Sequence, residues 1–289
     1  MIGSVGEGLY ELGVDDGCPG SARGGYGGDT ANTAVMAARL GGGRFCGRVG
    51  DDALGRELLA FWRDAGVDTR FVALDPAPTG IYVNERLPEG RCRFHYHRQG
   101  SAGSRLSSED VTDEFLAGLD ALHYSGITLS ISTSAAAAAR SAARRARDRG
   151  AVISFAVNHR PALHPDVREL AAAAHAADVV FASAEEAELI LGAARPAAPS
   201  ELVITLGEGG AVAFAGGEEI RVPAPPVELV DATGAGDALA AGYLTARAGG
   251  APPAEALQRG VAAATLSCRA FGAARSYPEP SELEAAVPA

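Results

Sequence analysis

The segment 228-ELVDATGAGDALAAGYL-244 decides how the rest of the chain is interpreted. An apolar, strand-like run ends at Asp231, a Gly-Ala-Gly turn follows, and a helical run extends to about Arg247. Backbone N–H groups at the start of a helix have no intrahelical acceptor, so such a turn can bind an anion. Asp237 falls in the first turn of this helix.

Asp237 has an ordinary interpretation and a catalytic one. In the first, it is an acid that the helix dipole stabilises. In the second, the amides of Gly234, Ala235 and Gly236 hold the developing charge of a transferred phosphoryl group. Asp237 then accepts the proton of the attacking hydroxyl. A dinucleotide-binding turn is disfavoured, because Leu239 stands where GxGxxG needs its last glycine.

The composition restricts the class of protein. The chain has 289 residues, 47% apolar and 21% charged, so a sizeable core is expected. The net charge of −11 and pI of about 5.0 argue against nucleic acid or an anionic membrane as a partner. The four dispersed cysteines suggest neither a disulfide framework nor a zinc site. The sequence shows no signal peptide and no membrane-spanning run, so a cytoplasmic protein is expected.

All 25 basic residues are arginine, and the chain contains no lysine. A Walker A phosphate loop requires Gly-Lys followed by Ser or Thr, so that loop is excluded. A lysine Schiff base is excluded too, and with it pyridoxal enzymes and class I aldolases. Because the net charge is −11, a phosphate-bearing ligand must be held locally.

Strands and helices alternate along most of the chain, as in a parallel sheet covered by helices. Strands are expected at 1–7, 44–50, 121–130, 151–158, 178–183 and 201–207, and helices within 27–42 and at 54–65, 134–149 and about 166–177. Segment 79–98 differs, because two alternating runs meet at Pro88-Glu89-Gly90, which predicts a β-hairpin. The glycine-rich segments GGDTAN, TLGEGGA and TGAGD are each expected to follow a strand and to line one crevice.

Four blocks resemble the ribokinase-like (PfkB) sugar kinases, in that family's order. They are GGDTANTAVMAARLGG, GRVGDDALGRELLAFWRDAGVDT, VITLGEGGAVAF and DATGAGDALAAGYL. The resemblance implies a ribokinase-like three-layer α/β/α sandwich with a small β-sheet lid. It implies one domain over 1–289, with lid segments at about 7–24 and 79–98. It also implies ATP-dependent phosphorylation of a sugar-like hydroxyl with Mg²⁺.

The family's motifs assign roles to particular positions. Asp237 matches the catalytic base, and Gly234, Ala235 and Gly236 match the anion hole. Glu186 matches an acid linked to Mg²⁺ through water. The positions that match ATP contacts are Ser183, Thr205, Gly207, Gly209, Gly210, Ala211, Gly234 and Gly236. Ala232 departs from the family's usual Thr, which leaves monovalent-cation dependence open.

The predicted hairpin bears on the substrate. Tyr96 and Arg98 are two residues apart, so they share one face of a strand with Cys92 and Phe94, and Tyr82 can join them from the partner strand. An ordinary surface hairpin is the alternative. A lid that turns Arg98 inward would favour a carboxylate, because a guanidinium matches one bidentately.

Further blocks resemble the 2-keto-3-deoxygluconate kinase subgroup of that family: YHRQGSAGSRLSSED, LHYSGITLSIS and ISFAVNHRPAL. The resemblance assigns substrate contacts to Gly28, Asp29, Asn32, Tyr82, Tyr96, Arg98, Ile127, Arg160 and Asp237. Ala156 and His164 replace the subgroup's usual Asp and Trp, which weakens the assignment of the substrate more than that of the reaction.

Three alternatives stay open. A kinase for fructose, ribose or tagatose-type sugars keeps Asp237 but needs no carboxylate-binding arginine. A sensor would bind sugar acid or nucleotide without turnover, and a NAD-dependent enzyme lacks its fingerprint here. Because exposed strand edges tend to pair, a homodimer or larger homo-oligomer is expected through the lid. The partners are then a small sugar acid and ATP.

Overall fold

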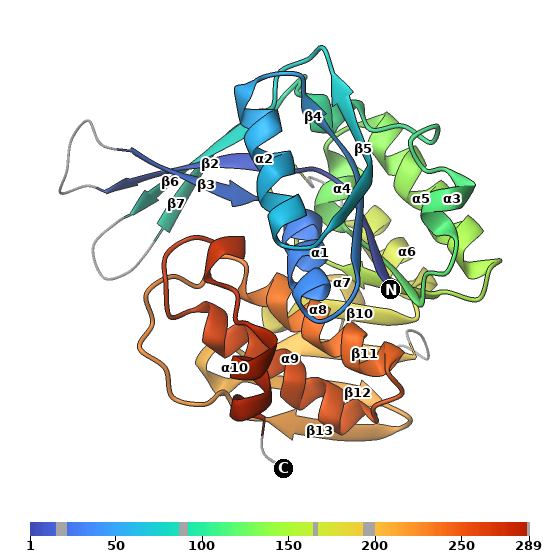
Figure 1. Ribbon diagram of the computed structural model, residues 1–289. Helices are drawn as coiled ribbons and strands as arrows, with labels where there is room; N and C mark the ends of the chain where they lie inside the picture. The colour runs from blue at the N-terminus through green and yellow to red at the C-terminus, as the bar shows by residue number, and fades with distance from the viewer. Residues whose placement is uncertain (16–21, 87–91, 164–166, 193–199, 288–289) are drawn as a thin grey trace.

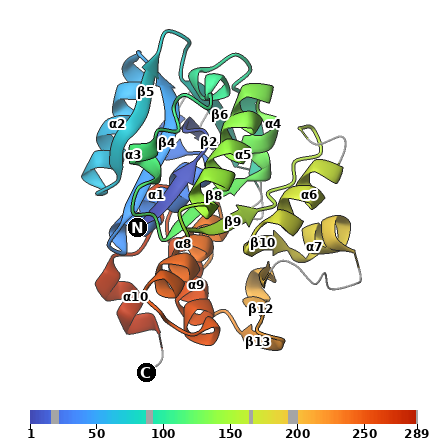
Figure 2. The ribbon, with the colours of Figure 1, turned by 90° about the vertical axis from the view of Figure 1, so that its right-hand side faces the viewer.

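A nine-stranded sheet forms the centre of the molecule. The computed structural model describes residues 1–15, 22–86, 92–163, 167–192 and 200–287. The strand order is β13-β12-β11-β10-β9-β8-β1-β4-β5, parallel except where β12 pairs with β11 and with β13. Figure 2 shows β5 and β13 at opposite edges. The strands are β1 Ile2–Val5, β4 Gly43–Gly50, β5 Asp68–Asp75, β8 Ala121–Ser125, β9 Val152–Ala156, β10 Val179–Ser183, β11 Glu201–Thr205, β12 Ala211–Ala215 and β13 Glu218–Val222.

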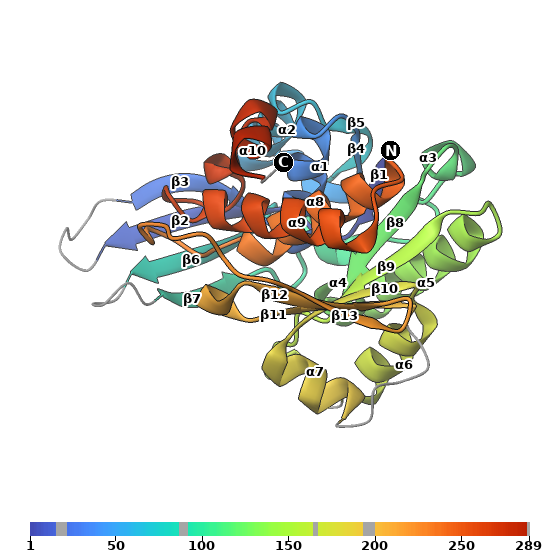
Figure 3. The same ribbon diagram turned by 90° about the horizontal axis from the view of Figure 1, so that it is seen from below.

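Helices cover both faces of this sheet, as Figure 3 shows from below. One layer contains α1 Asp29–Arg39, α2 Ala53–Asp64, α8 Ala235–Ala248, α9 Pro253–Ser267 and α10 Pro280–Ala286. The other contains α3 Asp113–Leu116, α4 Gly126–Ser130, α5 Thr133–Arg147, α6 Arg168–Ala176 and α7 Ala184–Leu191. Each layer buries its own apolar cluster against the sheet, so the predicted three-layer sandwich is confirmed. Within the described ranges, every helix is too short or too polar to cross a bilayer.

A second sheet of four strands extends from the body at the left of Figure 1. Its order is β3-β2-β6-β7, built from β2 Leu9–Asp15, β3 Ala22–Gly27, β6 Gly80–Arg86 and β7 Cys92–His97. β6 and β7 are antiparallel, with Tyr82 opposite Tyr96. The predicted pairing of the hairpin is therefore confirmed, while its turn at 88–90 lies outside the described residues. We call this sheet the lid sheet.

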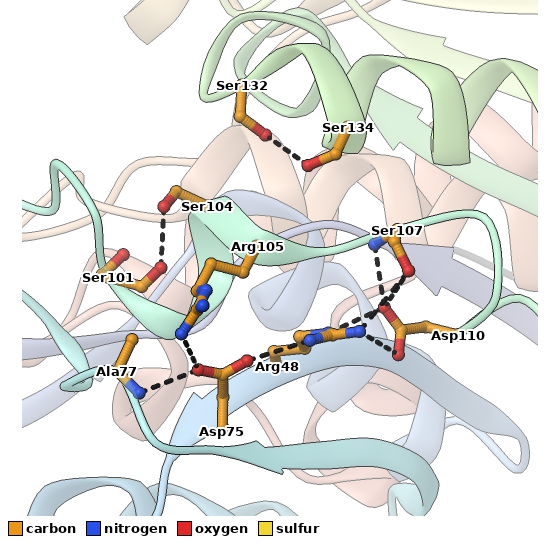
Figure 4. A network of polar contacts seen from close by, with 10 residues as sticks. All are labelled: Arg48, Asp75, Ala77, Ser101, Ser104, Arg105, Ser107, Asp110, Ser132 and Ser134. Carbon is orange, nitrogen blue, oxygen red and sulfur yellow. Dashed lines mark hydrogen bonds and ion pairs between the residues drawn. The ribbon is translucent and has the colours of Figure 1, made fainter.

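A network of ion pairs fixes the segment that follows β7 to the main sheet (Figure 4). Arg48, on β4, donates to Asp110 at 2.8 Å and to Asp75, at the end of β5, at 2.9 Å. Arg105 donates to the other oxygen of Asp75 at 2.9 Å. These ion pairs join β4 and the end of β5 to residues 105–110 of the segment that follows the lid sheet.

The structure corrects two expected strands: one is shorter than expected, and the other is not a strand. The strand expected over 121–130 ends at Ser125, because the Ser125 hydroxyl accepts a hydrogen bond from the Thr128 N–H and begins α4. The run that ends at Asp231 is not a strand, since the last strand before α8 is β13, Glu218–Val222. Three prolines, Pro223, Pro225 and Pro226, lie between, and proline cannot donate to a sheet. The TGAGD turn therefore does not directly follow a strand.

Candidate active site

Two cavities meet at the start of α8. The first, of about 470 Å³, lies between the lid sheet and the body, and the second, of about 420 Å³, opens beside β10 and β11. Four residues line both cavities: Asn158, Arg160, Gly236 and Asp237. Asp237 therefore stands at the boundary between two ligand-sized spaces.

The start of α8 has the geometry expected of an anion-binding turn. Gly234 precedes the helix in the left-handed conformation, at φ 81°, and Asp237 occupies the first turn. Tyr277 donates to the Gly234 carbonyl at 2.9 Å, and Asp231 accepts from the Thr233 N–H at 2.9 Å. These contacts hold the loop. The Ala235 N–H donates to the Ala232 carbonyl at 3.2 Å, so an anion at this helix N-terminus would meet the amides of Gly234 and Gly236.

The Asp237 side chain does not cap its own helix. Its Oδ2 accepts a hydrogen bond from Asn32, on α1, at 2.9 Å. Burial raises the pKa of Asp237 well above its ordinary value, and the negative charge of Asp29 raises it further. The hydrogen bond from Asn32 and the positive charge of Arg160 act in the opposite direction. A carboxylate in such an environment is a stronger proton acceptor than one in water.

Asp29 is held by a residue that the sequence analysis did not single out. Asn158 donates to Asp29 Oδ2 at 2.9 Å and lines both cavities. Its φ of 41° is the one positive value outside glycine in the described part of the chain. A left-handed residue at a ligand site is a common sign of function. The available signal was the position of Asn158 two residues before Arg160, in the block ISFAVNHRPAL.

The first cavity brings together every residue expected to contact substrate. Its lining includes Gly28, Asp29, Asn32, Tyr82, Tyr96, Arg98, Ile127, Arg160 and Asp237. On the lid sheet, the rings of Tyr82 and Tyr96 lie 5.9 Å apart, and the Arg98 guanidinium lies 4.5 Å from the centre of the Tyr96 ring. Cys92 and Phe94 line the same cavity, so the prediction that they share one face with Tyr96 and Arg98 is confirmed.

Arg98 has a partner that the sequence did not predict. Its guanidinium forms an ion pair with Glu7, in the loop after β1, and both side chains line the first cavity. The exposed fractions of the two side chains are 10% and 2%, so the pair is largely withdrawn from water.

The second cavity contains part of the expected nucleotide site. Ser183, Glu186 and Thr205 line it, whereas the expected Gly207, Gly209, Gly210 and Ala211 follow in the loop after β11 and in β12, outside its lining. Of the expected anion-hole residues, Gly234 lines the first cavity and Gly236 both, while Ala235 lines neither.

Glu186 links the start of α7 to the segment after β9 through hydrogen bonds to backbone N–H groups. It accepts from the backbone N–H of His159 at 2.6 Å and of Ser183 at 2.8 Å, and Ser183 in turn caps α7. Ala156 also lines the second cavity, Ala232 lines the first, and His164 lies outside the described residues.

The comparisons with known proteins agree with this architecture. The structure of a fructokinase with bound ATP from Xylella fastidiosa matches with a TM-score of 0.90, at 26% identity over 99% of this chain and 97% of that one. The aminoimidazole riboside kinase of Salmonella enterica, complexed with its riboside and an ATP analogue, matches with a TM-score of 0.87, at 28% identity over 99% of each chain. The fold is therefore the ribokinase-like α/β fold.

The chain belongs to the pfkB family of carbohydrate kinases, whose family model matches residues 13–280. The 2-dehydro-3-deoxygluconokinase of Thermoproteus tenax is 37% identical over 89% of this chain and 83% of its own length. Fructokinase-1 of Zea mays is 34% identical, over 57% of this chain and 53% of its own. The protein is thus a carbohydrate kinase, and its relatives act on more than one kind of sugar.

Proposed function

We propose that this kinase phosphorylates a sugar acid with ATP, and that the sugar acid is 2-keto-3-deoxygluconate, converted to its 6-phosphate. The observation that carries the proposal is the position of Asp237 on the wall that the two cavities share. A sugar in the first cavity and the triphosphate of ATP in the second would meet at this residue. The Thermoproteus tenax relative supports the choice of substrate.

In this proposal the reacting groups follow from the wall residues. Asp237 takes the proton of the attacking hydroxyl, and the amides of Gly234 and Gly236 stabilise the charge on the transferred phosphoryl group. Asp29 and Asn32 hold other hydroxyls of the sugar. Holding acceptor and donor in line is the main contribution that a protein makes to phosphoryl transfer.

The acid end of the substrate is assigned to Arg98 and Arg160. Both line the first cavity, from the lid sheet and from the segment after β9 respectively. Two guanidinium groups facing one cavity favour a carboxylate over a hydroxyl, because charge-assisted hydrogen bonds are about twice as strong as neutral ones.

Mg²⁺ fits the second cavity as an ion held through water. Both Glu186 oxygens already accept backbone N–H groups, yet a carboxylate oxygen can accept a second hydrogen bond, and Glu185 lines the same space. Bound with ATP, Mg²⁺ would supply charge neutralisation at the phosphates. Thr205 and Ser183 line the same cavity and would contact the nucleotide.

A neutral-sugar kinase is the second candidate. Arg98 already has a carboxylate partner in Glu7, so the cavity is less positive than its arginines alone suggest. The match to a maize fructokinase points the same way.

A coupled ADP-release assay separates the candidates. Purified protein with ATP and Mg²⁺ is given 2-keto-3-deoxygluconate, fructose, ribose or gluconate. We expect kcat/KM for the keto-deoxy acid to exceed that for fructose by at least tenfold. A preference for fructose or ribose would retain Asp237 as the base but reject Arg98 and Arg160 as carboxylate ligands. Binding without turnover of any substrate would favour the sensor.

We also propose a homo-oligomer formed through the lid sheet. β7 is an edge strand, and its Phe94 and Tyr96 side chains are 38% and 40% exposed. A second copy would cover both the edge and these rings. Sedimentation equilibrium should give at least twice the mass of the 29.3 kDa chain. A monomer at micromolar concentration would contradict this proposal.

The cytoplasmic location and any monovalent-cation dependence remain predictions.

A further inference from the structure

The proposed function leaves the role of Glu7 unexplained. Glu7 lies in the loop between β1 and β2, on the body, whereas Arg98 follows β7 of the lid sheet. Their ion pair spans 91 positions of sequence and forms part of the floor of the first cavity. Any carboxylate that binds Arg98 must therefore do so beside another carboxylate.

Two like charges in a cavity with little water repel strongly. With Glu7 ionised, the pair with Arg98 is neutral overall, and it offers a sugar acid less attraction than a single arginine would. Only one Arg98 nitrogen, Nη1, donates to Glu7, so the other guanidinium N–H groups leave a geometric route to a second carboxylate. The obstacle is the charge of Glu7.

The surroundings of the second oxygen of Glu7, Oε2, favour the protonated, neutral form of this side chain. Oε2 is buried and has no hydrogen-bond partner among the described residues. An ionised oxygen in such a place is costly, and protonation removes the cost. Burial raises the pKa of Glu7 to about 7, in spite of the opposing charge of Arg98, and Asp29 contributes in the same direction as burial. The other charged groups that line the cavity are Asp231, Asp237 and Arg160.

We propose that Glu7 determines how the cavity accepts acidic substrates: the substrate carboxylate binds the N–H groups of Arg98 that Glu7 does not accept, and Glu7 takes up one proton from solvent as this happens. The inference rests on the proposed function, because it requires a sugar acid. The step is a simple protonation, in which a carboxylate and a solvent proton give a neutral carboxyl group. The charge of the cavity is thereby kept constant when the acid enters.

Calorimetry measures this proton directly. Binding of 2-keto-3-deoxygluconate is followed without ATP at pH 8, in buffers that differ in ionisation enthalpy. The protein carries Asp237→Asn, which removes the other cavity carboxylate whose pKa is strongly raised. We expect uptake of about 0.9 proton per bound substrate, since at pH 8 a group with a pKa of about 7 is about nine-tenths ionised. Adding Glu7→Gln should abolish the uptake.

Glu11→Gln in the same background is the matched control. Glu11 is also a buried carboxylate with a raised pKa; it accepts from Asn84 and is hydrogen-bonded to Tyr82 of the cavity wall, but it does not itself line the cavity and does not contact Arg98. We expect this variant to keep the proton uptake. Equal uptake with and without Glu7→Gln, or tight binding with no uptake, would overturn the inference alone. A failure of wild-type protein to bind or phosphorylate any sugar acid would overturn the proposed function together with it.

A second experiment compares Arg98→Ala with the double variant Arg98→Ala, Glu7→Gln. Because both variants lack Arg98, an effect of that substitution on the lid sheet is common to them. Arg98→Ala removes the charge and the hydrogen bond that lower the pKa of Glu7, so in this variant Glu7 becomes charged only above pH 7, whereas Arg98→Ala with Glu7→Gln carries no charge at this position at any pH. We expect kcat/KM for the acid to be the same in the two variants at pH 6 and to become lower in Arg98→Ala than in the double variant as pH rises and Glu7 ionises. Equal values for the two variants up to pH 9.5 would show that Glu7 does not oppose the substrate carboxylate.

Discussion

At the scale of single residues, the proton affinity of Asp237 depends on three neighbours. After burial, the charge of Asp29 raises its pKa, and Asn32 and Arg160 lower it. The acidic limb of a pH profile of kcat/KM reports the pKa of the essential base in the free enzyme. Changes in these neighbours should therefore be visible as movements of that limb.

Arg160→Gln should have two separable effects. Loss of the positive charge raises the pKa of Asp237, so the acidic limb of kcat/KM moves to higher pH. Loss of a charge-assisted hydrogen bond, worth about 1.5–3 kcal/mol, raises KM for the sugar acid by about 10- to 100-fold. Steady-state kinetics between pH 5 and 9 check both.

The control is Arg105→Gln, which removes an arginine bound to Asp75 outside both cavities. Its acidic limb should coincide with that of the wild type. If Arg160→Gln also left the limb in place, Arg160 would not act on the base.

At the scale of elements, the start of α8 contains two glycines with opposite requirements. A methyl group on Gly234 would lie 2.9 Å from the Tyr277 hydroxyl and 3.0 Å from the Ala273 side chain, at a φ of 81° that L-residues rarely adopt. A methyl group on Gly236 would meet no atom within 4 Å. Gly236 faces the two cavities, where a ligand would meet the methyl group instead.

Gly234→Ala should therefore lower the free energy of unfolding by about 1–2 kcal/mol. Gly236→Ala should unfold at or above the wild-type urea midpoint, because alanine is the better helix former, yet lose at least tenfold in kcat. Urea titration and the ADP assay measure the two quantities. Full activity in Gly236→Ala would show that this turn does not contact the transferred phosphoryl group.

β8 carries a buried histidine that makes stability depend on pH. His123 pairs across the sheet with Ser4 on β1 and Ser154 on β9, and its Nδ1 lies 2.9 Å from the Ser154 hydroxyl. Burial lowers the pKa of His123 to about 4, against an opposing contribution from Asp29. The unfolded chain therefore binds the proton first, and stability is lost as pH falls from about 6.5 to 4.

The loss should amount to about 3 kcal/mol over that range. Because Glu7, with its raised pKa, acts in the opposite direction, the informative quantity is a difference between proteins. The stability gap between wild type and His123→Gln, from urea unfolding, should shrink steadily from pH 7 to pH 4.5. His175→Gln, at an exposed position, should leave the wild-type pH dependence intact. A constant gap for His123→Gln would mean that this histidine binds its proton over the same pH range in the folded and the unfolded chain.

Most of the strands and helices that were predicted are confirmed, because their hydrophobic periodicity and caps agree with the tertiary structure, whereas no prediction was made for β5, α9 and α10. The exceptions have local causes. At Ser125 a capping hydroxyl interrupts an apolar run, and before Asp231 the residues have strand propensity but no neighbouring strand to pair with. The sequence analysis did not predict β12 and β13 as separate strands after the loop around Gly207–Gly209. They extend the edge of the main sheet in antiparallel orientation.

At the scale of the whole molecule, the site is assembled from residues that are far apart in sequence. Asn32 and Asp237 are 205 positions apart, and Asn158 and Asp29 are 129 apart. Strand periodicity could predict that Tyr96 and Arg98 share one face with Cys92 and Phe94, since that depends on one strand. It could not predict Glu7 opposite Arg98 or Asn158 beside Asp29, because those contacts depend on how the lid sheet and β9 are placed on the body.

The measurement that tests the central claim most directly compares wild type with Asp237→Asn. Turnover of 2-keto-3-deoxygluconate with ATP and Mg²⁺ is set beside the dissociation constants of both ligands, determined by calorimetry. We predict that kcat falls by about 10²–10⁴, the contribution of a positioned general base, while neither ligand binds more weakly. If Asp237→Asn kept kcat within threefold of wild type, Asp237 would not be the base, and the shared wall of the two cavities would not be the site of phosphoryl transfer.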